Sequence, residues 1–147
     1  MEKKVYAVLI VDDSEDDRFF LRTALDRFPR LNLIGEARDG EEAIAYLSGA
    51  GPYRDRQLHP MPDLMLLDIQ MPRKTGFEVL QWLRKQGFSA LTVIVLSGSP
   101  LGQDVEASLA LGASGFWTKT AEGEQQRAIL CEIEEMLDRR HCVTAHP

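Results

Sequence analysis

The stretch "VLIVDDSEDD", from Val8 to Asp17, joins an apolar run directly to a group of acidic residues. The apolar residues 5–11 are continuous rather than alternating, which is typical of a strand covered on both faces. Asp12 and Asp13 stand side by side where this strand ends. Because adjacent carboxylates repel each other, the pair is interpreted either as a solvated cap for the following helix or as ligands of a cation.

Apolar runs of the same kind recur at 63–67 and 91–96, shorter apolar stretches stand at 31–36 and 114–118, and helical spacing of apolar residues separates them. Strands are expected at 5–11, 31–36, 63–67, 91–96 and 114–118. Helices are expected at 15–28, 40–48, 103–111 and 122–139, with a further helix beginning at a Thr75–Glu78 capping box. Ser14 and Asp39 are candidate N-caps, and Gly112 is a candidate helix stop. Strands alternating with helices predict an α/β fold, and the flavodoxin-like, doubly wound parallel order 2-1-3-4-5 fits this (βα)5 pattern.

The length of 147 residues suits one domain with a sizeable core. The domain is expected to span 1–147, with its core at about 5–139 and a short tail at 140–147. A net charge of −6 is opposite to the basic face of a nucleic-acid binder. No apolar run approaches the ~20 residues of a membrane span, and no signal-peptide pattern is present. With Cys131 and Cys142 interpreted as free thiols, the chain is expected in the cytoplasm, without nucleic-acid or membrane partners.

Four of the predicted strands end on polar side chains. In chain order these are Asp12 and Asp13, Asp68, Ser97 and Lys119. The carboxyl ends of parallel strands lie along one edge of the sheet, and ligands bind there where the strand order reverses. These five side chains are therefore expected to meet in one shallow crevice.

Three carboxylates in one crevice raise one another's pKa and are costly near low-dielectric walls. A divalent ion relieves this repulsion, and an all-oxygen set suits Mg²⁺ or Mn²⁺. Asp12 and Asp13 alone fit a helix cap equally well, but the polar residues at matching strand ends favour the cation site. A metal ion, an ammonium and a hydroxyl also suit a phosphoryl group, which a carboxylate accepts as an aspartyl phosphate. Asp68, on the central strand, is the candidate acceptor.

Four segments carry a resemblance to a known family: "VDDSEDD" at 11–17, "LLDIQMPRKTGFEVL" at 66–80, "VLSGS" at 95–99 and "FWTK" at 116–119. In this order they resemble the receiver domains of two-component response regulators, from Val5 to about Arg139. The resemblance implies a stand-alone phosphoacceptor domain, not an enzyme, that receives a phosphoryl group from a histidine kinase. It implies that phosphorylation then switches a protein–protein or dimer interface in a phosphorelay.

The resemblance also implies roles for single residues. It assigns Asp68 as phosphoacceptor and places Mg²⁺ on Asp12, Asp13, Asp68 and the backbone carbonyl of Gln70. Ser97 and Lys119 are implied to contact the phosphoryl oxygens. Phe116 is implied to act with Ser97 as the switch, although its position fits a plain core aromatic equally well. Met71-Pro72 and Gly76 match the loop after the acceptor, where glycine permits close backbone approach.

Two features depart from the common receiver pattern. Thr120 follows Lys119 at the position where the family has proline, often after a cis peptide bond. A cis bond before threonine would cost ~2.5–4 kcal/mol, whereas a trans bond would alter how Lys119 approaches the site. The 48–62 loop is longer than the ~12–15 residues usual in compact domains, and is either a tolerated insertion or a partner contact. With the segment around Asp68, this loop is similar to the small regulators that pair with phytochrome-type histidine kinases.

The resemblance implies two kinds of partner, a sensor histidine kinase and a second copy of the chain. The dimer is implied to use either the face of 103–111, 114–118 and 122–139, or the last helix and tail with Met136 and Leu137. Among these residues, the apolar stripe Ile129, Leu130 and Ile133 is interpreted as ordinary core.

Three alternatives share parts of this pattern. A phosphohydrolase of the haloacid dehalogenase type also uses an aspartyl phosphate, but it needs an acid at the position of Gln70. A flavodoxin needs a hydroxyl- and glycine-rich phosphate loop after the first strand, where this chain has acids that repel phosphate. A degenerate receiver would bind partners without phosphorylation, and the presence of the acids, Ser97 and Lys119 argues against it.

Overall fold

The computed structural model describes residues 3–71, 75–88, 90–98, 102–119 and 123–145. Its centre is one parallel five-stranded sheet in the order β2-β1-β3-β4-β5, as predicted. The strands are β1 (Tyr6–Val11), β2 (Leu31–Ala37), β3 (Leu64–Asp68), β4 (Thr92–Ser97) and β5 (Gly115–Thr118). The helices are α1 (Glu15–Leu25), α2 (Gly40–Ser48), η1 (Gly51–Tyr53), α3 (Gly76–Gln86), α4 (Gly102–Ala110) and α5 (Glu124–Ala145).

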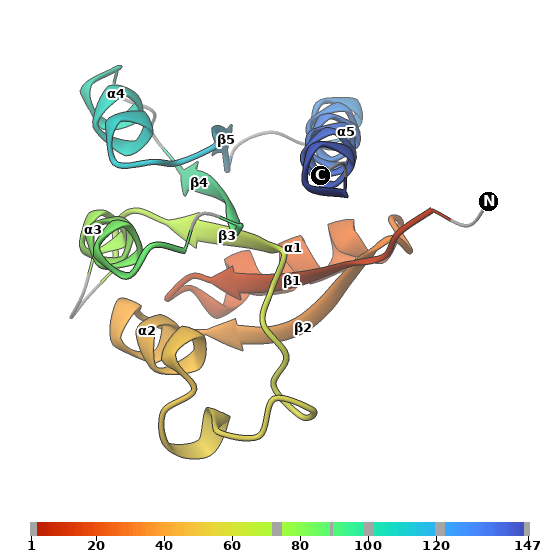
Figure 1. Ribbon diagram of the computed structural model, residues 1–147. Coiled ribbons are helices and arrows are strands. Elements are labelled where there is room, and N and C mark those ends of the chain that lie inside the picture. The colour runs from red at the N-terminus through yellow and green to blue at the C-terminus, as the bar shows by residue number, and fades with distance from the viewer. Residues whose placement is uncertain (1–2, 72–74, 89, 99–101, 120–122, 146–147) are drawn as a thin grey trace.

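The sheet is covered on both faces, which explains its continuous apolar strands. In Figure 1, α2, α3 and α4 lie on one side of it, and α1 and α5 lie on the other. Alternate residues of β1 divide between the two cores: Leu9 packs toward α2 and α3, and Ile10 packs toward α1 and α5. Because all five strands are parallel, their carboxyl ends lie along one edge of the sheet, and the polar residues that follow the strands lie at this edge.

The predicted helix starts are confirmed by their hydrogen bonds. Ser14 Oγ accepts from the amide of Asp17 at 3.2 Å, and the Asp39 carboxylate accepts from Glu42 at 2.8 Å. Thr75 and Glu78 form the expected capping box at the start of α3. Gly112 follows α4 with a φ of 104°, which only glycine adopts at little cost.

Two helix ends differ from the prediction by three residues or more. The first helix ends at Leu25 rather than residue 28, because Pro29 disfavours helical backbone at the residue before it. The last helix continues to Ala145, so residues 140–145 are helical and the expected tail is wrong for them. Arg140 helps to hold this end, since its guanidinium donates to the hydroxyls of Thr92 and Ser114 at 2.5 and 3.3 Å.

The long loop after α2 is an ordered insertion. The Arg56 guanidinium donates to the carbonyl oxygens of Tyr46 and Leu47, each at 2.8 Å, and to that of His59 at 3.1 Å. It thereby gives a donor to the Leu47 carbonyl at the helix end and a second donor to the Tyr46 carbonyl, which also accepts from the amide of Gly49. The rings of Tyr46, Tyr53 and His59 contact one another with centroids 5.0–5.8 Å apart.

Two further predictions concern the chain as a whole. Cys131 and Cys142 are both free and exposed. Within the described ranges, every helix falls short of the length and apolarity that crossing a bilayer requires.

Candidate functional site

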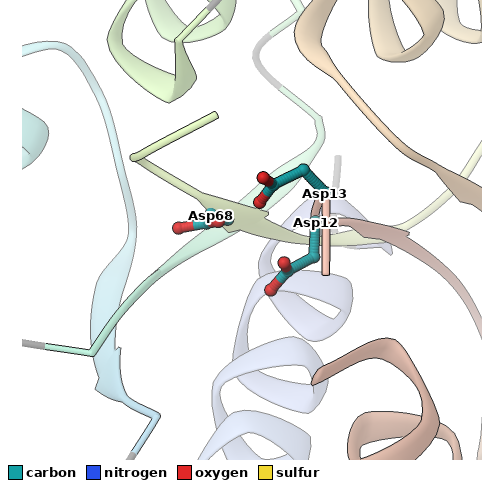
Figure 2. A group of neighbouring side chains, drawn as sticks. All are labelled: Asp12, Asp13 and Asp68. Atoms are coloured by element: carbon teal, nitrogen blue, oxygen red, sulfur yellow. The ribbon is translucent and has the colours of Figure 1, made fainter. Parts of the chain in front are cut away.

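Three carboxylates meet at the carboxyl edge of the sheet. Asp12 and Asp13 follow β1, and Asp68 is the last residue of the neighbouring β3 (Figure 2). The register pairs Val11 with Leu67, so the residues that follow come side by side. One oxygen from each carboxylate lies within 4.8 Å of the others. Asp12 is fully buried and Asp68 is 4% exposed, whereas Asp13 is exposed to solvent.

Asp12 is fixed by its neighbours on α1. Its Oδ1 accepts from the amide of Ser14 at 2.9 Å, and its carbonyl accepts from the Arg18 guanidinium at 2.7 Å. Arg18 is itself held by Glu36 at 3.1 Å. The other oxygen, Asp12 Oδ2, is buried and accepts no well-oriented hydrogen bond from the described residues. A buried carboxylate oxygen left in this way suits a hard cation.

Lys119 places an ammonium among these acids. Its Nζ lies 2.7 Å from Asp12 Oδ2, 2.9 Å from Asp17 Oδ2 and 3.3 Å from Asp68 Oδ2. Burial disfavours the ammonium, but the contacts with Asp12, Asp17 and Asp68 outweigh this effect and raise the pKa of Lys119 above its ordinary value. The Lys119 amide donates to the carbonyl of Ser97 at 2.8 Å, which ties the ends of β4 and β5 together.

Asp68 is unusually easy to protonate. Burial is the main cause that raises its pKa from 3.8 to about 6, and the charge of Asp12 adds to it. The amide of Gln70, which donates to Asp68 Oδ1 at 3.1 Å, and the ammonium of Lys119 act in the opposite direction. Cations at this edge therefore favour the ionised, nucleophilic form of Asp68.

Gly76 explains how α3 begins in direct contact with the end of β3. A Cβ at this position would lie 2.5 Å from the carbonyl oxygen of Asp68 and 2.6 Å from the Cα of Ile69. Both neighbours are backbone atoms and cannot rotate away. The predicted close approach at Gly76 is confirmed.

The remaining predicted residues lie at the same edge. Ser97 is buried and follows Leu96, which is the register partner of Asp68. Phe116 is partly buried, pairs in register with Val95 and packs against the core under α2 and α3. Its switch role, like the phosphoryl contact of Ser97 and the metal contact of the Gln70 carbonyl, stays a prediction. Pro72 and the Lys119–Thr120 bond lie outside the described residues.

Two residues at the site were not predicted to act there. Asp17 was given no role at the site, yet its carboxylate contacts Lys119 across 102 positions of sequence. Arg18 is 8% exposed and shares the buried face of α1 with Leu21 and Leu25. A charged residue at core spacing was the signal that could have identified Arg18, whereas nothing local marks Asp17.

Chemically, the edge combines three carboxylates, of which Asp12 and Asp68 are buried, with one ammonium held among them. The oxygen set suits Mg²⁺ or Mn²⁺ and offers nothing for a soft metal. An ammonium 3.3 Å from the Asp68 carboxylate is placed to neutralise charge on a group transferred to that carboxylate. This arrangement supports phosphoryl transfer, which depends mainly on positioning and charge neutralisation.

Comparison with known proteins is consistent with this geometry. The family model described as the response regulator receiver domain matches residues 8–130. The crystal structure of the phosphorylated cyanobacterial phytochrome response regulator RcpA is 32% identical, with a TM-score of 0.77, over 90% of this chain and 94% of RcpA.

A second similar protein is response regulator Rcp1. The curated Rcp1 of Synechocystis is 32% identical over 77% of this chain and 76% of its own length. The Mn²⁺-bound crystal structure of Rcp1 is 30% identical, with a TM-score of 0.69, over 90% of this chain and 89% of Rcp1.

Several curated relatives are longer proteins. This chain spans 32% of the protein-glutamate methylesterase/protein-glutamine glutaminase 3 of Geobacter sulfurreducens, with 32% identity over 90% of the chain.

Proposed function

The chain belongs to the family of response regulator receiver domains, and from this premise we propose that Asp68 accepts a phosphoryl group from a histidine kinase. The observation that carries the proposal is the convergence on Asp68 of a cation-binding acid set and the Lys119 ammonium. The acceptor, the charge that stabilises the product and the expected metal ligands come from three separate segments, at the ends of β1, β3 and β5. Their meeting at one edge supports a single chemical role.

Asp12, Asp13 and Asp68, with the backbone carbonyl of Gln70, would hold Mg²⁺ or Mn²⁺. When bound, the ion neutralises charge on the phosphoryl oxygens. An oxygen of Asp68 attacks phosphorus, the bond to the donor nitrogen breaks, and an aspartyl phosphate forms. The Lys119 ammonium then balances the new negative charge. The Mn²⁺-bound Rcp1 structure and the buried Asp12 Oδ2, whose neighbour is a cation, support this assignment of the metal ligands.

The proposed output is a change of protein contacts, in the cytoplasm and without enzymatic turnover of a separate substrate. Ser97 and Phe116 would respond to the phosphoryl group and repack the surface of α4, β5 and α5. A second copy is proposed to dock on that surface or along α5. Similarity to RcpA and Rcp1 supports a sensor kinase of the phytochrome type as partner.

Phosphorylation by a small donor tests this proposal. With acetyl phosphate and Mg²⁺, intact-mass spectrometry should detect one added phosphoryl group on the protein, and chelation should abolish it. Asp68→Asn should abolish labelling, whereas Asp16→Asn, which removes an exposed acid of α1, should retain it. Equal labelling of the Asp68→Asn protein would overturn the assignment of the acceptor.

A further inference from the structure

We propose that Asp17 is a positioning residue that keeps the Lys119 ammonium beside Asp68 when a cation displaces it from Asp12. The inference deepens the proposed function and rests on it. Asp17 lies on α1, outside the three proposed metal-binding acids, and its Oδ2 is 2.9 Å from Lys119 Nζ. Among the described residues, the Lys119 ammonium donates a well-oriented side-chain hydrogen bond to Asp17. It lies closer to Asp12 Oδ2, but that ion pair lacks hydrogen-bond geometry.

The position of the ammonium creates a conflict with metal binding. Lys119 Nζ lies 2.7 Å from Asp12 Oδ2, the buried oxygen that is otherwise available to a cation. A divalent ion at that oxygen would repel an ammonium at contact distance. Lys119 must therefore give up Asp12 as the metal enters, even though its positive charge is still needed beside Asp68.

Asp17 resolves this conflict by offering the ammonium a second anionic partner. Lys119 has three N–H donors on a flexible stem, so loss of the Asp12 contact leaves the contacts to Asp17 and Asp68 in place. The Lys119 side chain is 20% exposed and that of Asp17 is 38% exposed, so the pair is only partly screened. Without Asp17, the ammonium would either oppose the metal at Asp12 or move into solvent and leave Asp68.

Magnesium affinity, measured by calorimetry on the whole chain, tests the proposal. Asp17→Asn should weaken Mg²⁺ binding about fivefold, the factor that a partly exposed ion pair is worth. Asp16→Asn is the matched control, because it removes the same charge from the same turn of α1 and no described contact joins it to Lys119. Its effect should stay below about twofold, as expected of a screened surface charge.

A second background separates positioning of Lys119 from a direct effect of charge. In Lys119→Met protein no ammonium needs to be held, so Asp17→Asn should weaken Mg²⁺ binding no more than Asp16→Asn does. As a spectroscopic readout, the ¹⁵N signal of the Lys119 ammonium should persist in Mg²⁺-loaded wild type and in Asp16→Asn, and be lost in Asp17→Asn.

The outcomes distinguish this inference from the proposed function. If wild type binds Mg²⁺ but Asp17→Asn behaves like Asp16→Asn, the role of Asp17 is overturned while the receiver function stands. An equal loss from Asp17→Asn with and without Lys119 also overturns it. If wild type takes up no Mg²⁺, the proposed metal site itself fails, and the inference fails with it.

Discussion

Replacing Asp68 by asparagine is expected to stabilise the metal-free protein near neutral pH. The Asp68 side chain is buried, and its pKa of about 6 shows that the fold favours its protonated form. A rise from 3.8 to about 6 corresponds to about 3 kcal/mol of unfolding free energy lost when Asp68 is ionised. Asparagine carries no charge and keeps an oxygen to accept the Gln70 amide.

The pH dependence identifies the cause of this gain. Below about pH 4 the Asp68 carboxyl is protonated in both the folded and the unfolded protein, so it does not lower the unfolding free energy. As pH rises from about 4 to about 6, the carboxyl ionises more readily in the unfolded protein, and the unfolding free energy falls. The advantage of Asp68→Asn should therefore be absent below about pH 4 and constant above about pH 6. For a chain of this size, it corresponds to a rise of about 6–12 °C in Tm.

The assay is thermal and urea unfolding with a chelator present, across this pH range. Asp16→Asn serves as control, because it removes an exposed acid from the start of α1 and should change stability little. Adding Mg²⁺ should stabilise wild type more than the Asp68→Asn protein. The reasoning is refuted if the variant gains nothing at neutral pH, or if its gain is equally large in acid.

Three further predictions test other parts of the structure. Gly76→Ala should lower the unfolding free energy by about 1–3 kcal/mol, because the added methyl group would meet the Asp68 carbonyl. Gly98→Ala places its methyl group in open space and should be nearly neutral in the same urea titration. Similar losses in the two variants would contradict the close contact at Gly76. Arg56→Met should cost about 1–3 kcal/mol by removing the guanidinium donor to the Leu47 carbonyl, and denaturation beside an exposed Arg54→Met control measures the difference. The pKa of Tyr6 is raised to about 12, chiefly by burial and also by its hydrogen bond to Asp138, so wild type should lose stability as pH rises above about 10. Tyr6→Phe should show a smaller alkaline loss, since burial also raises the pKa of Tyr46 and Tyr53, and identical pH profiles would exclude Tyr6 as a source.

Sequence reasoning was most successful where one simple rule applied. Continuous apolar runs identified β1, β3 and β4, alternation with helical patterns located β2 and β5, and the parallel order then determined which edge their polar ends share. That rule is why Asp12, Asp68 and Lys119, far apart in the chain, were correctly expected to meet. The cap residues were found because capping depends on residues only three positions apart.

The missed features depend on contacts between distant segments. Asp17 meets Lys119 only because α1 begins beside the end of β5, and spacing along the chain does not encode that distance. Arg140 extends the last helix by reaching hydroxyls at the starts of β4 and β5. Likewise, the 48–62 loop is held in a folded form by the hydrogen bonds of Arg56 to the end of α2.

The continuation of α5 to Ala145 has a geometric consequence for anything joined beyond it. Arg140 fixes the rotational phase of this helix relative to the sheet, and each added residue turns the direction of exit by about 100° and advances it by about 1.5 Å. A partner fused after Ala145 through a rigid helical junction would thus face a direction set by the number of junction residues. Inserting residues one at a time would sweep that partner around the helix axis in steps.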